Sequence, residues 1–347
     1  MEGFRKIGFW QTAHLGDALL SLPVLSALKA RFPEAQLHFF VRDGLQGLFA
    51  DQPELARVYG FAKRGRDKSL LSSIRFGQKL GKQGFDLWIS AHTSLRSAIV
   101  AYLAGSPRRI GYDSPWFNRL AYTDAVPRRF AELAEIERLF ELVRPLGIAP
   151  PIPEPRLTLP KAAQEAAAGL WKRHDLAGRT VLGLHPGSTW PTKRWPAERF
   201  GAVARFAARS GARVLVFGGQ AERRLAAEVV AAAGGEQGGL VLDLAGQMSL
   251  PELAAVIGRL SVFLCNDSGP MHLAWIQGVP LVALFGPTTR GLGFFPRGAG
   301  SAVLEIDLPC RPCGLHGHAS CPLHHHDCLR LIQPERVWTT LAPRLGP

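Results

Sequence analysis

The chain has 347 residues, of which 47% are hydrophobic, so it falls outside the disordered class and is long enough for two hydrophobic cores. Its 41 Lys and Arg outnumber its 28 Asp and Glu and give a net charge of +13, which indicates an anionic partner such as nucleic acid, an acidic membrane surface or a phosphorylated substrate. It contains neither the roughly 18 consecutive uncharged apolar residues of a membrane span nor a signal peptide, so we expect a cytoplasmic protein.

Strands and helices are predicted to alternate along the first half of the chain. Apolar patterns predict strands at 5–11, 36–41, 85–90 and 109–112, and helices at 17–31, 95–103 and 131–143. The Pro-rich stretch 144–155 suits neither a helix nor a central strand, so it predicts a stiff linker. We therefore expect one domain over 1–155 and a second over 156–347, whose last helix can pack back on the first domain.

The second half repeats this alternation more regularly. Strands are predicted at 180–185, 213–217, 239–244, 260–265 and 279–285, and helices at 196–209, 221–233, 250–258 and 270–277. Strands that alternate with helices of about 10–15 residues form parallel, doubly wound sheets. The sequence thus predicts an α/β protein with two Rossmann-like, doubly wound domains facing a cleft.

A sharp turn from strand to helix is predicted at Asn266-Asp267-Ser268-Gly269-Pro270-Met271-His272. Pro just inside a helix, preceded by Ser and Asp, marks the helix start. Such a turn directs unpaired N–H groups and the positive end of the helix dipole at its ligand, which is how α/β proteins hold phosphates. The alternative is an ordinary capped helix.

A second candidate phosphate loop follows the strand at 180–185. Gly187 permits close approach of the backbone, Ser188 and Thr189 offer donors, and Lys193 offers an ammonium. The loop is neither a dinucleotide-binding motif nor a P-loop. Together with the turn at 266–272 it favours a bound diphosphate.

A carboxylate stands where the first strand passes into the first helix, in His14-Leu15-Gly16-Asp17. Asp17 is either a helix cap or a catalytic base, and both remain open from the residues alone.

Three groups of motifs occur in order along the chain: Leu15-Gly16-Asp17, then Pro186-Gly187-Ser188 with Lys193-Arg194-Trp195-Pro196, then 266–272 with Phe285-Gly286-Pro287. Over essentially the whole chain they resemble glycosyltransferase family 9, the lipopolysaccharide heptosyltransferases. The segment with Cys310, Cys313, Cys321 and Cys328 is most similar to the heptosyltransferase II type.

The resemblance implies a GT-B fold and an inverting transfer of a heptose from ADP-L-glycero-D-manno-heptose to the inner core of Kdo–lipid A, with no cofactor required for catalysis. It implies that Asp17 is the general base. Lys193 would stabilise the leaving diphosphate together with Ser188, Thr189 and the amides around Ser268 and Gly269. It implies four further donor-site residues. Asp267 would contact sugar hydroxyls or cap the helix, and Glu222 would bind the ribose. Met248 would line the adenine pocket, and His272 would either pack in the core or take part in function.

The positive charge then has a candidate partner in the anionic Kdo–lipid A head group. Basic residues of the first domain are expected to bind it, namely Lys63, Arg64, Arg66, Lys68 and Arg96. This implies peripheral contact with the cytoplasmic face of the inner membrane, and no nucleic acid is expected. Two alternatives remain: a family-9 transferase adding a later heptose or another sugar, and a basic, non-catalytic protein of this fold that binds membrane or nucleic acid.

The four C-terminal cysteines, with His324, His325 and His326, have a spacing similar to a zinc site. Because disulfides are disfavoured in the cytosol, the alternatives are a structural zinc or free thiols.

Overall fold

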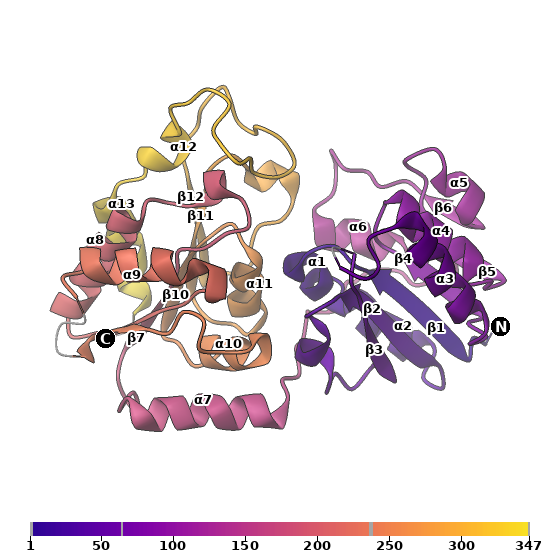
Figure 1. The fold of residues 1–347 in the computed structure, drawn as a ribbon, viewed down its shortest axis with the longest axis horizontal. Coiled ribbons are helices and arrows are strands. Elements are labelled where there is room, and N and C mark those ends of the chain that lie inside the picture. Colours follow the sequence, from indigo (N-terminus) through magenta and orange to yellow (C-terminus); the bar gives the residue numbers. More distant parts are fainter. Residues whose placement is uncertain (1–2, 64, 236–238, 346–347) are drawn as a thin grey trace. The chain divides into compact units, whose positions relative to one another are not determined.

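The computed structural model describes residues 3–63, 65–235 and 239–345, and the chain divides into two compact units, Met1–Pro160 and Lys161–Pro347 (Figure 1). The boundary lies a little beyond the residue 155 that the Pro-rich stretch predicts. The side chain of Gln52 explains the difference, because it donates to the carbonyl of Arg156 at 3.1 Å and accepts from the amide of Thr158 at 3.0 Å. These bonds tie the end of the linker to the first unit.

The first unit is one six-stranded parallel sheet in the order β3-β2-β1-β4-β5-β6. Its strands are β1 Lys6–Gln11, β2 Gln36–Arg42, β3 Arg57–Phe61, β4 Leu87–Ser90, β5 Arg108–Tyr112 and β6 Asp124–Val126. Its helices are α1 Leu15–Leu20, α2 Leu22–Arg31, α3 Leu70–Gly81, α4 Leu95–Leu103, α5 Asn118–Ala121 and α6 Glu135–Glu141.

The helix predicted over 17–31 is two helices that meet at Ser21. Pro23 lies in the first turn of α2, where its missing N–H costs nothing, and the Ser21 hydroxyl donates to the carbonyl of Asp17 at 2.9 Å. The short α1 therefore carries Asp17 on a segment of its own.

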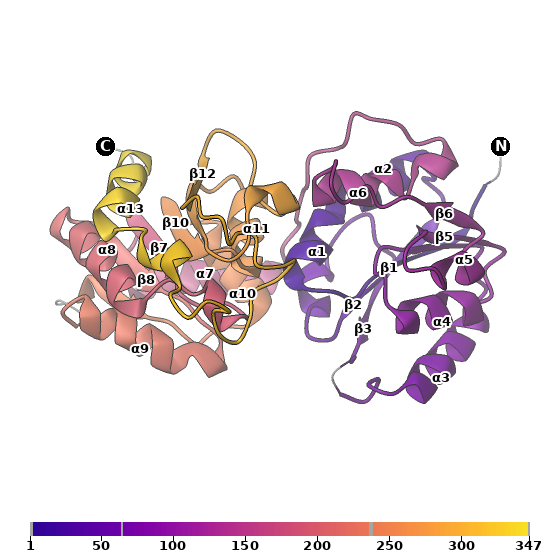
Figure 2. The same ribbon diagram turned by 90° about the horizontal axis from the view of Figure 1, so that it is seen from above.

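Helices cover both faces of this sheet, with α1, α2 and α6 on one side and α3 and α4 on the other (Figure 2). An aromatic cluster fills the side under α3 and α4, where Trp10, Phe40 and Trp88 are fully buried. The large apolar side chains of the three central strands thus fix the sheet from which the site loops project.

The second unit repeats the topology, in the order β12-β11-β10-β7-β8-β9. Its strands are β7 Val181–His185, β8 Arg213–Val216, β9 Val241–Asp243, β10 Val262–Asn266, β11 Leu281–Phe285 and β12 Ser301–Glu305. Its helices are α7 Lys161–Arg173, α8 Ala197–Arg209, α9 Arg223–Ala232, α10 Leu250–Ile257, α11 Gly269–Ile276, α12 Asp327–Arg330 and α13 Pro334–Leu341.

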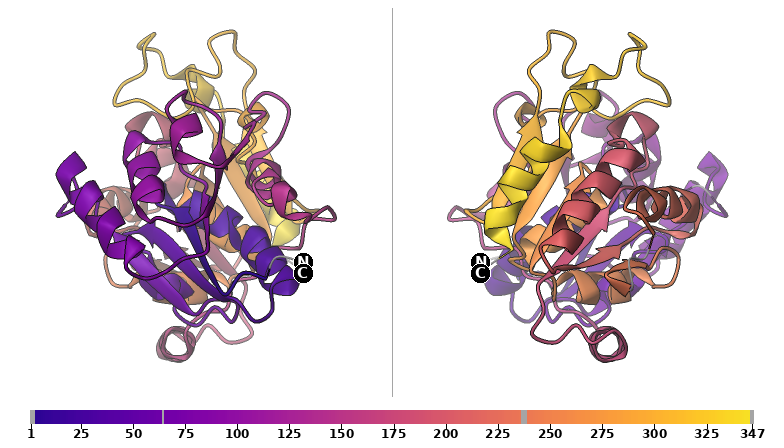
Figure 3. Two further views of the ribbon diagram at one scale, coloured as in Figure 1. Left: turned by 90° about the vertical axis from the view of Figure 1, so that its right-hand side faces the viewer. Right: turned by 90° about the vertical axis from the view of Figure 1, so that its left-hand side faces the viewer.

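The last helix, α13, belongs to the second unit and packs against α8 and β11 (Figure 3, yellow). Its Val337 and Leu341 are fully buried in the same core as Phe200 of α8. The apolar face of α13 is therefore covered within the second unit, and its packing on the first domain stays a prediction.

In both sheets the strand order reverses between two central strands, β1 and β4 in the first unit and β7 and β10 in the second. Open α/β sheets bind ligands at the carboxyl ends of such strands.

Among the described residues, none of the helices combines the length and apolar character that crossing a bilayer requires.

Candidate active site

The predicted donor-site residues of the second unit all lie just beyond the carboxyl ends of its strands, on loops or in the first turn of α11. Ser188, Thr189 and Lys193 follow β7, Glu222 follows β8, Met248 follows β9, and Asp267, Ser268, Gly269 and His272 follow β10. Since neighbouring parallel strands end at one edge of a sheet, these loops share that edge. The fold thereby brings Ser188 and His272, which are 84 positions apart in the sequence, to the same side of the unit.

Lys193 and Asp267 form an ion pair at the centre of this edge. Their Nζ and Oδ2 atoms are 2.5 Å apart, and the side chains are only 12% and 10% exposed. The buried hydroxyl of Thr288 donates to the same Oδ2 at 2.6 Å. Asp267 therefore does not cap α11, as was one expectation, because its carboxylate is engaged by these two donors; the N-cap position belongs to Ser268.

The turn into α11 has the features of an anion site. Ser268 is extended (φ −153°, ψ 169°), and Pro270 follows in the first turn of the helix. Among the described residues, the buried Oγ of Ser268 has no hydrogen-bond partner. A buried polar atom at a helix N-terminus, beside an ammonium, suits a phosphate oxygen.

The loops after β7 and β10 are locked together by Asn266. Its fully buried side chain accepts from the amide of Trp195 at 3.0 Å and donates to the carbonyl of Pro186 at 2.7 Å. The two halves of the candidate phosphate site therefore keep a fixed spacing.

Glu222 lies directly over Gly187. A Cβ on Gly187 would collide with the Glu222 carboxylate, whose Oε2 accepts from the amide of Gly219 at 2.8 Å. The same oxygen lies 3.8 Å from Nε2 of His185, whose pKa burial lowers although Glu222 opposes that shift. A carboxylate on the β8 loop is thus held beside the glycine of the β7 loop.

The other predicted donor residues differ in exposure. Thr189 is exposed and Met248 is half-buried. His272 is 3% exposed and packs its ring 6.2 Å from that of Trp275, so its geometry is that of a packing residue.

Asp17 lies in the first turn of α1, beyond the carboxyl end of β1, and is half-buried. Its Oδ2 accepts from the amide of His14 at 3.0 Å. The carboxylate is therefore anchored to its own helix, which fits the capping interpretation and leaves a base interpretation possible.

Under α1 lies a buried charge network on α6. Glu135 and Arg138 are 1% and 0% exposed, with 2.7 Å between Oε2 and NH1, and Arg128 lies 3.4 Å from the other oxygen of Glu135. Burial raises the pKa of Glu135, and the charge of Asp17 raises it further. Asp17 is thus near enough to this network to feel its charge.

The chain's family follows from comparison with known proteins. Residues 73–314 match the model of "Glycosyltransferase family 9 (heptosyltransferase)", which covers more than half of the sequence. The chain belongs to glycosyltransferase family 9.

Relatives and solved structures agree with this membership. The chain is 28% identical over 325 residues to lipooligosaccharide heptosyltransferase 2 of Campylobacter jejuni, covering 93% of this chain and 94% of the relative. The structure of the family-9 glycosyl transferase from Veillonella parvula has a TM-score of 0.87 at 24% identity, covering 99% and 98% of the two chains. That of E. coli ADP-heptose lps heptosyltransferase II has a TM-score of 0.79 at 24% identity, covering 98% of each. The GT-B fold is thereby confirmed.

The predicted acceptor residues of this family-9 glycosyltransferase surround the loop between β3 and α3. Arg96 of α4 donates to the carbonyls of Lys63 and Lys68 at 3.1 and 3.0 Å. Arg66 is exposed, and Arg64 lies outside the described residues. Burial lowers the pKa of His92, after β4, to about 3, with the charges of Lys63 and His14 acting in the same direction. This loop therefore adjoins the strand ends near Asp17.

The four C-terminal cysteines do not assemble a metal site. In the described part of the chain, no three His, Cys, Asp or Glu side chains are grouped to hold a metal ion, and the cysteines are free. Two nearby histidines each donate one ring N–H to a backbone carbonyl, His318 Nε2 to that of Cys313 at 3.1 Å and His326 Nε2 to that of Thr192 at 2.7 Å. The choice between a structural zinc and free thiols stays a prediction.

Several residues of the site escape sequence reasoning, chiefly Asn266, Thr288, Arg311 and Glu135. Asn266 alone carries a signal, because it is a polar residue that ends a fully apolar strand. The others act through partners distant in sequence or by burial, and neither is visible in the residue pattern.

Proposed function

We propose that the chain transfers a heptose from ADP-L-glycero-D-manno-heptose to the inner core of Kdo–lipid A in lipopolysaccharide biosynthesis, as a transferase of the second-heptose type. Family membership supports a glycosyl transfer. The similarity to a heptosyltransferase of Campylobacter jejuni and to the E. coli ADP-heptose heptosyltransferase II supports the heptose and the ADP donor. The observation that carries the proposal is the Lys193–Asp267 pair at the start of α11. It supplies a cation and a helix N-terminus where a nucleotide diphosphate needs both.

Donor binding is assigned to the second unit. Lys193 and the amides of Ser268 and Gly269 would neutralise the diphosphate, assisted by Ser188 and Thr189. Glu222 would accept hydrogen bonds from the ribose hydroxyls and Met248 would line the adenine pocket. Asp267 would reach the sugar hydroxyls while it keeps Lys193 in place.

Acceptor activation is assigned to Asp17. Its carboxylate would take the proton of the acceptor hydroxyl as that oxygen attacks the anomeric carbon. The new C–O bond forms as the bond to the diphosphate breaks, and ADP leaves with the electron pair. One displacement without a covalent intermediate inverts the anomeric centre, and the cations of the donor loops stabilise the charge that develops.

Binding of the acceptor is assigned to Lys63, Arg64, Arg66, Lys68 and Arg96, whose charges complement Kdo carboxylates and lipid A phosphates. Exposed apolar side chains stand beside this loop: Leu70 and Leu71 at the start of α3 are 50% and 55% exposed. Basic and apolar residues side by side fit the cytoplasmic surface of an anionic membrane, so we include peripheral contact with the inner membrane in the proposal.

The test is Asp17→Asn, measured by transfer of heptose to a panel of truncated core acceptors, with the products weighed by mass spectrometry. We expect the rate to fall by roughly 10²–10⁴, with ADP affinity unchanged. Asp113→Asn is the matched control, because Asp113 follows β5 at the same sheet edge and pairs only loosely, 3.8 Å from the exposed Arg119. If Asp17→Asn turned over as fast as the wild type, Asp17 would not be the general base. If the wild-type protein transferred no heptose, the proposed heptosyltransferase activity would be refuted.

A further inference from the structure

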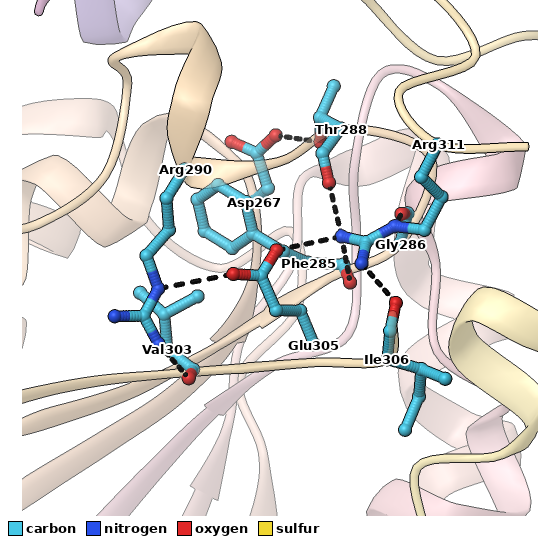
Figure 4. A network of polar contacts seen from close by, with 9 residues as sticks. All are labelled: Asp267, Phe285, Gly286, Thr288, Arg290, Val303, Glu305, Ile306 and Arg311. Atoms are coloured by element: carbon cyan, nitrogen blue, oxygen red, sulfur yellow. Dashed lines mark hydrogen bonds and ion pairs between the residues drawn. The ribbon is translucent and has the colours of Figure 1, made fainter. Parts of the chain in front are cut away.

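A buried arginine of the C-terminal segment lies behind the donor loops. Arg311 is only 4% exposed, and a buried guanidinium must satisfy its donors. It donates to the carbonyls of Phe285, Gly286, Thr288 and Ile306 and to Oε2 of Glu305 (Figure 4). One side chain thus ties the end of β11 and the following turn to the end of β12.

That turn leads to the Lys193–Asp267 pair. Arg311 NH2 lies 2.6 Å from the carbonyl of Thr288, and the hydroxyl of Thr288 lies 2.6 Å from Oδ2 of Asp267, the oxygen that also binds Lys193. Thr288 therefore links the two groups: its backbone is held by the buried guanidinium, and its hydroxyl bonds the carboxylate that binds the ammonium of the donor site.

The same segment also holds the Lys193 side of the pair. The amide of His318 donates to Oγ1 of Thr192 at 2.7 Å, and His326 donates to the Thr192 carbonyl at 2.7 Å. Gly317 packs so closely that a Cβ there would lie 3.0 Å from Cγ of Lys193. Residues 311–326 therefore contact both loops that meet at the ion pair.

We propose that Arg311 is a positioning residue of the donor site: by fixing the 285–288 turn it sets Thr288, which orients Asp267 and through it Lys193. This rests on the proposed function, because Lys193 matters only if a diphosphate binds there. A lysine at 311 keeps the charge but has one donor centre, and it lacks the planar fork that bridges two strand ends.

Arg290 provides a matched control for Arg311, because both arginines pair with the carboxylate of Glu305. Its Nε lies 3.3 Å from Oε1 of Glu305 and its NH2 donates to the carbonyl of Val303, but it is 52% exposed and bonds no carbonyl of the 285–288 turn. Substituting it removes an ion pair with Glu305 while leaving the turn intact.

The experiment compares Arg311→Lys, Arg290→Gln, Thr288→Val and Thr288→Ser in full-length protein. We measure the gain in Tm on adding ADP, and kcat and KM for heptose transfer. We expect Arg311→Lys to lose most of the ADP-induced gain and to lower kcat at least tenfold with acceptor KM unchanged. Arg290→Gln should match wild type within twofold. Thr288→Val should reproduce the Arg311→Lys loss, and Thr288→Ser, which keeps the hydroxyl, should restore it.

A wild-type response to ADP in either Arg311→Lys or Thr288→Val overturns the proposal, and so does a loss in Arg290→Gln equal to that in Arg311→Lys. Should Arg311→Lys not fold, the Thr288 pair still tests the step from the turn to Asp267, and a wild-type ADP response in Thr288→Val overturns the proposal. Wild-type protein that binds no ADP would instead refute the proposed function.

Discussion

Gly187, in the loop after β7, has no room for a side chain. The glycine is required because the Glu222 carboxylate occupies the space of its Cβ. Glu222 in turn is held by the amide of Gly219. Sequence reasoning identifies both Gly187 and Glu222 but cannot pair them, since they lie on loops after different strands.

Gly187→Ala should therefore weaken ADP binding at least tenfold, about 1.4 kcal/mol, because the new methyl group displaces Glu222. Isothermal titration calorimetry measures this directly. Gly219→Ala is the control: its backbone is extended at φ −75° and its Cβ would lie 3.8 Å from Oε2 of Glu222, so affinity should be retained. Equal affinities for both variants would contradict the placement of Glu222 over Gly187.

Between elements, α8 packs tightly on α9 at Gly201. A Cβ on Gly201 would lie 2.5 Å from Cβ of Ala232 and 2.9 Å from the carbonyl of Val229. The helix pattern over 196–209 is predicted from the sequence, whereas the need for glycine inside it is set by the neighbouring helix. An isolated helix would prefer alanine at this position.

Gly201→Ala should destabilise the protein, by about 1–3 kcal/mol as an overpacked contact. Gly169→Ala in α7 should instead stabilise it by about 0.5–1 kcal/mol, because only Arg173 NH1, at 3.5 Å, lies near its Cβ. Denaturant unfolding gives both free energies of unfolding. A higher free energy of unfolding in Gly201→Ala would mean that propensity, rather than packing, decides at Gly201.

For the molecule as a whole, the proposed membrane contact would draw on both the net charge of +13 and the exposed apolar residues. The loop before α3 is basic, and Leu70 and Leu71 follow it. The charges would supply long-range attraction to an anionic surface, and the leucines would supply buried apolar area once contact is made.

Wild-type protein should therefore co-sediment with vesicles containing phosphatidylglycerol more than with phosphatidylcholine vesicles, and high salt should release it. Leu70→Ser with Leu71→Ser should lower the bound fraction several-fold. Leu315→Ser with Leu323→Ser is the control, because these leucines of the second unit are 54% and 60% exposed. Equal losses in the two double variants would show that general surface hydrophobicity drives binding.

The alternation of strands and helices, and the loops that carry the site, can be predicted from the residue pattern alone. Buried strands such as β7, β10 and β11 are continuous apolar runs, and Gly, Pro, Ser and Asp mark where they turn, so local chemistry is sufficient. The edge strand β3 is not predicted, because Arg57 is exposed and the next residues are only half-buried. Its place depends on pairing with β2.

Which of these residues contact one another depends on the folded structure. Lys193 and Asp267 are 74 positions apart, and Thr192 and His326 are 134 apart, so no local pattern pairs them. Likewise, no local pattern shows that His318 and His326 bond to the carbonyls of Cys313 and Thr192. The sequence supplies the groups, while the order of the parallel strands sets which loops share an edge and hence which groups interact.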